Sequence, residues 1–294
     1  FNLLYNIGSS ILRAIGDSRR PLYILIVCTL TNLVLDLAFV LLFHMGVAGA
    51  GLATILSQAI SALLVLYFLS RSNECYKLTV RKIRFHSDIL RHIIKIGLPA
   101  GIQSSMFCIS NIIIQSTINT FGTDTMAAWT AYGKIDSVFW MLMSAFGISI
   151  TTFSGQNFGC GKLDRVKKSV RISLAMALGS SMLLSAILLL LGQYIFLLFT
   201  DDGNVLELGV HILRTLVPFY ATYVLVEVLS GAIRGTGESL RPMLISGFGI
   251  CVLRIVWITC FLGADSHLNM VLYSYPISWA FTSLLFLIYY LRGN

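Results

Sequence analysis

Charged residues are scarce in this chain of 294 residues, where they make up 12% of the sequence against 56% hydrophobic residues. Soluble domains carry about a quarter of charged residues, so this composition argues against an ordinary soluble domain. The mean hydropathy of +0.83 points the same way. Helices that are hydrophobic on all sides belong in lipid or in a very large core. The composition therefore predicts a membrane protein.

Motifs for catalysis, nucleotide binding and metal binding are also missing. The sequence has no H-E-x-x-H, no G-x-S-x-G and no G-x-x-x-x-G-K-[ST], and its six cysteines form no C-x-x-C pair. A membrane-embedded enzyme is therefore disfavoured, and no cofactor is expected. The first residues do not have the basic, apolar and small-residue segments of a signal peptide, so none is predicted. Any transport would draw its energy from an ion gradient.

Long apolar stretches are abundant. A hydrocarbon slab of about 30 Å needs about 20 helical residues, and eight stretches reach or approach that length. They cover residues 22–43, 47–69, 97–121, 126–158, 170–199, 206–231, 243–263 and 269–291. Residues 1–12 resemble the end of a ninth helix. The predicted fold is an all-α membrane protein, with membrane lipid as its surroundings.

The basic residues lie in alternate loops. Of the 21 Lys and Arg, 18 fall before the first full span, in every second loop after it, or at the C-terminal end. The intervening loops, 44–46, 122–125, 200–205 and 264–268, contain none. Positive loops stay on the cytoplasmic side, so a cytoplasmic C-terminus is expected. This alternation explains the net charge of +8 without a nucleic-acid partner.

A polar segment occurs twice. Arg13-Ala-Ile-Gly-Asp-Ser-Arg-Arg-Pro recurs as Arg234-Gly-Thr-Gly-Glu-Ser-Leu-Arg-Pro, 221 positions later. Each copy forms a short turn between apolar stretches. A membrane protein with such a repeat is typically a transporter built from two similar halves.

The longest and most basic loop, residues 72–95, divides the two halves. Residues 1–71 are interpreted as the C-terminal part of a first lobe, and residues 96–294 as a second lobe of six helices. By the repeat offset, residues 1–12 match the fourth helix of the second lobe. Three helices are then expected upstream, and the chain is predicted to be truncated at its N-terminus.

Asp36 is the main candidate site residue of the first lobe, because a carboxylate in lipid is costly. Asn32 lies four residues before it on the same helical face. Thr54 in the next span and Asn6 near the start add two further polar side chains. Together these oxygens suit Na⁺, or Asp36 could carry a proton. The alternative is that Asp36 and Asn32 only form hydrogen bonds between helices. By the offset they correspond to Leu253 and Trp257, so the scaffold does not need them.

The second lobe has buried charges of its own, which are either structural ion pairs or a second coupling or substrate site. The candidates are Gln103, Tyr132, Lys134, Asp136, Glu227 and Arg254. Lys134 and Asp136 are two residues apart, so they cannot face each other on one helix. Aromatic residues of the same spans are candidates for lining a cavity that receives flat cations. They are Phe107, Trp129, Tyr132, Phe139, Trp140, Phe146, Tyr220 and Tyr223.

Four motifs together resemble the multidrug and toxic compound extrusion (MATE) transporters, over the whole chain. They are Asn32-Leu-Val-Leu-Asp36, the segment from Gly46 to Thr54, the paired polar turns, and Gly155-Gln-Asn-x-Gly-x-Gly-Lys. The resemblance implies twelve helices in two lobes. It also implies a first-lobe cation site at Asn6, Asn32, Asp36 and Thr54, in the prokaryotic branch of the family. The Asp that the family has on its first helix is not in this sequence.

The resemblance further implies export of cationic amphipathic compounds in exchange for Na⁺ or H⁺ by alternating access. The expected location is a bacterial inner membrane, the expected partners are small organic cations, and a monomer is expected. Two alternatives stay open. One is a flippase for lipid-linked saccharides with a related two-lobe fold, which would need a cationic cavity. The other is an inactive fragment of a transporter.

Overall fold

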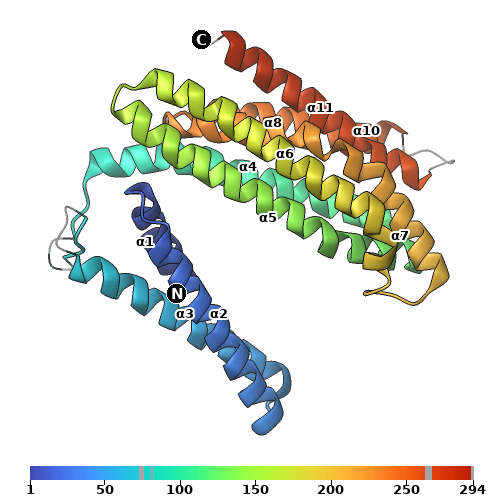
Figure 1. The fold of residues 1–294 in the computed structure, drawn as a ribbon, viewed down its shortest axis with the longest axis horizontal. Coiled ribbons are helices and arrows are strands. Elements are labelled where there is room, and N and C mark those ends of the chain that lie inside the picture. The colour runs from blue at the N-terminus through green and yellow to red at the C-terminus, as the bar shows by residue number, and fades with distance from the viewer. Residues whose placement is uncertain (73–75, 80, 82, 262–266, 293–294) are drawn as a thin grey trace. The chain divides into compact units, whose positions relative to one another are not determined.

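The computed structural model describes residues 1–72, 76–79, 81, 83–261 and 267–292. Parts of the expected linker and of the loop 264–268 lie outside these residues. Every regular element in the described part is a helix, and the chain forms two compact units, Phe1–His86 and Ser87–Asn294 (Figure 1). The division falls inside the expected linker. The first helix of the second unit begins at Ser87, earlier than residue 96, where the second lobe was expected to start.

Unit 1 consists of three packed helices. They are α1 (Asn2–Ala14), α2 (Arg19–Leu37) and α3 (Gly46–Arg71), and a π-helical segment, η1 (Ala38–Leu42), extends α2. Leu12, Ile24, Val65 and Leu69 form its core. A Cβ at Gly8 would lie 2.8 Å from a methyl group of Val65, so α1 and α3 approach closely there.

Unit 2 contains a larger bundle. Its elements are α4 (Ser87–Asn119), α5 (Thr123–Gly159), α6 (Leu163–Phe196), α7 (Gly203–Leu216), η3 (Val217–Phe219), α8 (Tyr220–Gly235), α9 (Leu240–Ser246), η4 (Gly247–Val252), α10 (Leu253–Phe261) and α11 (Leu268–Arg292). The short 3₁₀ segment η3 joins α7 to α8, and the π-helical η4 joins α9 to α10, so each set forms one span. Most residues of α8 are buried, which places it at the centre of the unit.

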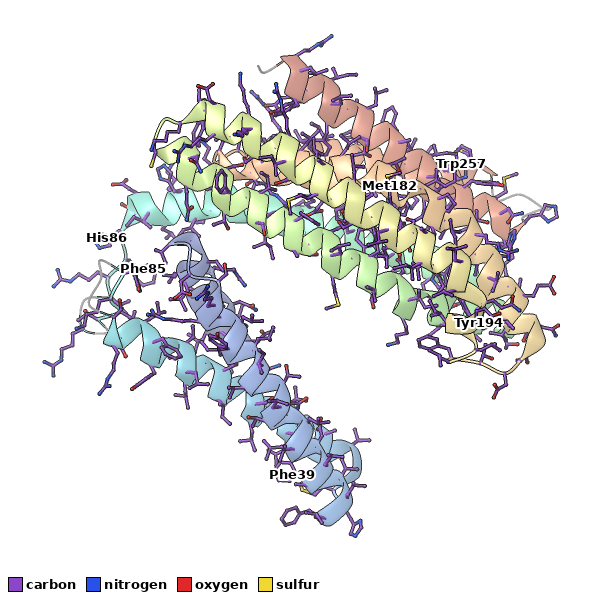
Figure 2. All side chains as sticks on the ribbon, in the orientation of Figure 1. Phe39, Phe85, His86, Met182, Tyr194 and Trp257 are labelled. Atoms are coloured by element: carbon purple, nitrogen blue, oxygen red, sulfur yellow. The ribbon has the colours of Figure 1, made fainter. Side chains whose placement is uncertain are left out.

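All eight predicted spans are confirmed. Eight helices in the described residues are long and apolar enough to cross a membrane, two in unit 1 and six in unit 2. Their outer faces carry large apolar side chains: on α6, Met182 is 64% and Tyr194 is 69% exposed (Figure 2). Such faces suit lipid contact. The protein is a multi-pass membrane protein.

The repeat in the sequence is also a repeat in the structure. Helices α1 and α8 end at Ala14 and Gly235, and α3 and α11 end at Arg71 and Arg292. Helices α2 and α9 begin at corresponding residues as well. All three pairs keep the same offset. These three helix boundaries therefore follow the sequence repeat to the residue.

The repeated turn has the same backbone in both units. Gly16 has φ of 90° and Gly237 has φ of 87°, a conformation that favours glycine because it has no Cβ. In unit 1, Arg20 pairs with Asp17 at 3.2 Å. In unit 2, Arg241 pairs with Glu238 at 2.7 Å.

Each of these arginines also lies over an aromatic ring. The guanidinium of Arg20 is 5.9 Å from the ring centre of Phe68, and that of Arg241 is 5.3 Å from the ring centre of Tyr289. Phe68 and Tyr289 again correspond by the offset. The arginine of the turn, held by its ion pair, thus joins α2 to α3 in unit 1 and α9 to α11 in unit 2 through the same cation–π contact.

Helices α5 and α8 meet at a seam of small residues. A Cβ at Gly235 would lie 2.6 Å from the backbone oxygen of Thr151, and one at Gly231 would lie 3.0 Å from that of Gly147. The Thr151 hydroxyl donates a 2.9 Å hydrogen bond to the Gly231 carbonyl across this seam. Because the neighbouring atoms belong to the backbone, they cannot move aside easily. The close approach fixes α8 against α5 and positions the side chains described below.

Candidate functional site

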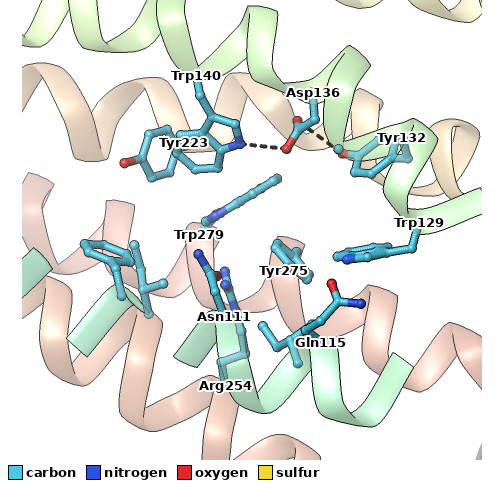
Figure 3. A pocket seen from close by; sticks show the side chains of 14 residues that line it. Asn111, Gln115, Trp129, Tyr132, Asp136, Trp140, Tyr223, Arg254, Tyr275 and Trp279 are labelled. Atoms are coloured by element: carbon cyan, nitrogen blue, oxygen red, sulfur yellow. Dashed lines mark hydrogen bonds between the residues drawn. The ribbon is translucent and has the colours of Figure 1, made fainter. Parts of the chain in front are cut away.

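A cavity of about 530 Å³ lies inside unit 2. Side chains of α4, α5, α8, η4, α10 and α11 line it, including one acid, Asp136, and one base, Arg254 (Figure 3). Pockets of about 300–1,000 Å³ bind small organic molecules in proteins. The cavity therefore has the size of a small-molecule site.

Asp136 is held by three aromatic donors. It accepts a 2.6 Å hydrogen bond from the indole nitrogen of Trp140, a 3.3 Å bond from the hydroxyl of Tyr132 and a short bond from the hydroxyl of Tyr220. The hydroxyls of Tyr132 and Tyr220 are 3.1 Å apart. The donors come from two helices, α5 and α8, so the carboxylate also ties these helices together. Its charge is balanced by hydrogen bonds, since no described cation lies within ion-pair distance of it.

Arg254, in contrast to Asp136, has few hydrogen-bond partners. Only 3% of the residue is exposed, and it forms no ion pair with any described acid. Nη2 donates a 3.1 Å hydrogen bond to the Ser278 hydroxyl, and the guanidinium carbon lies 3.9 Å from the ring centre of Tyr275. Nε is buried without a hydrogen-bond partner. A guanidinium has five N–H donors, so most of this group's capacity is unused.

Aromatic rings form the walls of the cavity. Tyr275 lies 5.6 Å from Trp279 and 5.9 Å from Trp129, measured between ring centres. Trp140 and Tyr223 form an edge-to-face pair at 4.7 Å. Figure 3 shows Asp136 entering from α5 and Arg254 from α10, with Tyr275 and Trp279 drawn between them. Such walls suit a flat aromatic ligand, because ring pairs add to the energy of apolar burial.

Glu227 and Gln103 belong to a second, smaller cavity of about 150 Å³. There an oxygen of Glu227 lies 3.6 Å from the guanidinium of Arg234, the arginine of the repeated turn. The hydroxyl of Tyr223 donates a 3.1 Å hydrogen bond to the other oxygen. Of the two interpretations left open by the sequence, this geometry favours a structural ion pair for Glu227.

In unit 1, the Asp36 carboxylate and the Asn32 amide lie on one face of α2. One turn before Asn32, the Cys28 thiol lies 3.3 Å from the Ser57 carbonyl of α3, so this face borders α3. Oδ1 of Asp36 and Nδ2 of Asn32 are buried without hydrogen-bond partners. Unsatisfied buried groups are costly, so each calls for an explanation, and a bound ion is one of them. The π-helical η1 begins two residues after Asp36, and such segments often occur at functional sites.

The two remaining candidates of unit 1 use their donors locally. The Thr54 hydroxyl donates to the Ala50 carbonyl at 2.9 Å, and the Asn6 amide donates to Asn2 at 3.0 Å. Both residues are exposed within the unit. Their oxygen lone pairs stay available to accept a cation. The four candidates come from α1, α2 and α3, and no hydrogen bond among the described residues joins them to one another.

The cavity corrects several expectations for unit 2. Lys134 is exposed and lies outside it, while Phe139 is fully buried and stacks on Tyr220 at 3.9 Å. Tyr275 and Trp279 were missed by the sequence interpretation. Both lie on α11 near Pro276, and aromatic residues in an apolar span give no sign of the direction they face.

A family model described as MatE matches residues 99–259. The probable multidrug resistance protein YpnP of Bacillus subtilis is 28% identical over 85% of this chain and 56% of its own length. An FAD transporter of Shewanella oneidensis is 28% identical over 70% of this chain and 46% of its own length. The chain thus spans about half the length of these relatives.

Solved structures share the fold. A crystal structure of MATE in the bent conformation superposes with a TM-score of 0.89, covering 98% of this chain and 65% of that chain at 22% sequence identity. At that level of identity the likeness concerns the fold alone.

Proposed function

Because the chain belongs to the MATE family of multidrug efflux transporters, we propose that it forms part of a cation-coupled antiporter that exports amphipathic aromatic compounds. Cationic compounds are the cargo that the family resemblance implies. The proposed location is a bacterial inner membrane with the C-terminus on the cytoplasmic side. A monomer is proposed, with Na⁺ or H⁺ as the coupling ion.

The unpaired Asp36 carboxylate carries this proposal. Asp36 is half-buried, with Oδ1 fully covered, and such a charge without a partner is unfavourable unless something else compensates for it. A monovalent cation bound by Asp36 and the oxygens of Asn6, Asn32 and Thr54, or a proton on Asp36, would do so. The contrast with Asp136, which has three donors, supports a different role for each carboxylate.

The cavity of unit 2 supports the cargo site. Its volume fits a drug-sized molecule, and its aromatic walls fit a flat one. In alternating access, ion binding at Asp36 and cargo binding in the cavity would favour opposite states, so each would release the other. The relatives' names include both multidrug resistance and FAD transport, so they leave the charge of the cargo undecided.

The test is gradient-driven uptake of the fluorescent cation ethidium into proteoliposomes that contain the purified protein. Asp36→Asn should reduce accumulation to simple equilibration under both a Na⁺ and a H⁺ gradient. Asp88→Asn, which removes an exposed carboxylate at the start of α4, serves as the control and should accumulate ethidium normally. Full accumulation by the Asp36→Asn variant would refute the coupling role.

The saccharide flippase receives less support. It needs several basic side chains around a pyrophosphate, whereas Arg254 is the one basic side chain among the described residues that line the large cavity, and Lys134 lies outside it. Arg234 borders the smaller cavity but is paired with Glu227. One guanidinium does not balance the charge of a pyrophosphate group.

A further inference from the structure

We infer that Arg254 forms a subsite for the acidic group of an aromatic ligand, so that the cavity of unit 2 accepts aromatic acids as well as the cations expected for the family. The inference rests on the proposed function in one respect, that this cavity holds the cargo. It adds a specific chemistry to that site: a planar apolar ring system that bears a single carboxylate or similar oxyanion.

The first reason is the state of Arg254. It is buried, lines the cavity and lacks an acidic partner among the described residues, and its Nε has no acceptor. Its contacts with Ser278 and Tyr275 hold the side chain in place but do not neutralise the charge. A buried arginine is normally paired, since leaving its charge uncompensated is costly. A planar guanidinium matches a carboxylate through two parallel hydrogen bonds.

The second reason is that the carboxylate of the same cavity, Asp136, already has hydrogen-bond donors from the protein. Asp136 accepts hydrogen bonds from Tyr132, Trp140 and Tyr220, and it lies beyond ion-pair distance from Arg254. The cavity therefore offers an unsatisfied charged donor but no equally free carboxylate among the described residues that line it. An entering acid gains new charged hydrogen bonds, whereas an entering amine must compete with three donors already in place.

The third reason is the arrangement of the rings around the arginine. Tyr275 lies beneath the guanidinium, and Trp279 and Trp129 lie next to Tyr275. A ligand whose acid reaches Arg254 therefore places its ring system among these side chains. The subsite recognises an acid attached to a flat ring, and a small inorganic anion would gain only the charged contact.

The experiment measures binding to the purified protein in detergent by calorimetry, without any ion gradient. The ligands share one ring: 2-naphthoate, neutral 2-naphthalenemethanol and protonated 2-naphthylmethylamine. Wild type should bind the naphthoate at least about 10-fold more tightly than the alcohol, as expected for hydrogen bonds to a charged group. Arg254→Gln should abolish this advantage, leave binding of the alcohol unchanged and strengthen binding of the amine.

Arg214→Gln is the matched control, because it removes the same charge from an exposed position on α7. It should keep the preference for naphthoate. Arg254→Lys keeps the charge and should retain part of the preference. Inorganic pyrophosphate should compete poorly, since it gains nothing from the rings.

Equal binding of naphthoate and alcohol by wild type would overturn the inference, and that result needs no variant to fold. An undiminished preference in Arg254→Gln, or displacement of naphthoate by low pyrophosphate concentrations, would overturn it as well. Because binding is measured without a gradient, its failure differs from a failure of coupling at Asp36.

Discussion

Units 1 and 2 share a scaffold but differ in the chemistry placed on it. Both contain the glycine turn, the ion pair and the arginine over an aromatic ring, with helix ends at matching positions. On the matching helices, unit 1 has Asn32 and Asp36 where unit 2 has Leu253 and Trp257. Next to Leu253 stands Arg254, where unit 1 has Leu33.

This difference between the units separates the residues that maintain the fold from those that are candidates for a function. Residues at the turn are kept in both units because the two helices that follow and precede it must pack in the same way. The mid-span polar residues are not kept, so folding does not require them. An unpaired acid in one unit and an unpaired base in the other are therefore the functional candidates of each.

The largest loss of stability is expected from a substitution at the seam of α5 and α8, where the packing differs from that at the matching position of unit 1. Gly235→Val would press its side chain against the Thr151 backbone and should cost about 3 kcal/mol of stability, the upper end for overpacking. The corresponding Ala14→Val in unit 1 should cost about 0.5 kcal/mol, because Ala14 already has a Cβ there and is exposed. Thermal unfolding in detergent, followed by circular dichroism, would measure both. Equal losses would contradict the described seam.

The two carboxylates should respond in opposite ways. Asp136→Asn removes the charged acceptor of three hydrogen bonds and should destabilise the protein by about 2 kcal/mol. Asp36→Asn removes an unpaired, half-buried charge, so stability should stay the same or rise. Unfolding midpoints of both variants, measured without added coupling ion, provide the test. A loss of stability in Asp36→Asn that matches that of Asp136→Asn would show that both acids are structural.

Replacing the glycine of the repeated turn should lower the stability equally in both units, which tests directly whether the two turns are equivalent. Gly16→Ala and Gly237→Ala each place a Cβ in a left-handed backbone, at a cost of about 1 kcal/mol. Denaturant titrations of each single variant and of the double variant should give additive losses. An effect confined to one unit would mean that the turns are not equivalent.

The smallest effect is expected for the ion pairs beside these glycines. Asp17→Asn and Glu238→Gln each remove a partly exposed pair, which should change stability by less than about 0.5 kcal/mol. High salt should reduce this small effect further. A loss above that range in one unit alone, in the same titrations, would show that its pair does more than clamp the turn.

Sequence patterns predicted much of the fold, because span length and the repeat are local properties. The eight spans, the turns and the grouping of the second unit into six spans all followed from them. The position of Lys134 could also have been predicted more sharply. Successive helical residues are about 100° apart, so if Asp136 faces the cavity, Lys134 two positions away faces outward.

The partners of the buried charges could not be predicted in the same way. The pairing of Glu227 with Arg234 stays within α8, yet the sequence interpretation assigned Arg234 only to the turn. Within the Asp136 network, Tyr132 and Trp140 lie one turn to either side on the same helix, so only the contact with Tyr220 depends on how α5 and α8 are rotated against each other. The stacking of Tyr275 under Arg254 depends on contacts between separate spans.

The central claim, that unit 1 couples the ion and unit 2 holds the cargo, is tested most directly by comparing two modes of ethidium movement in Asp36→Asn proteoliposomes. The account predicts that exchange between equal ethidium concentrations on both sides continues, while gradient-driven accumulation is lost. Loss of both modes, or retention of accumulation, would contradict it.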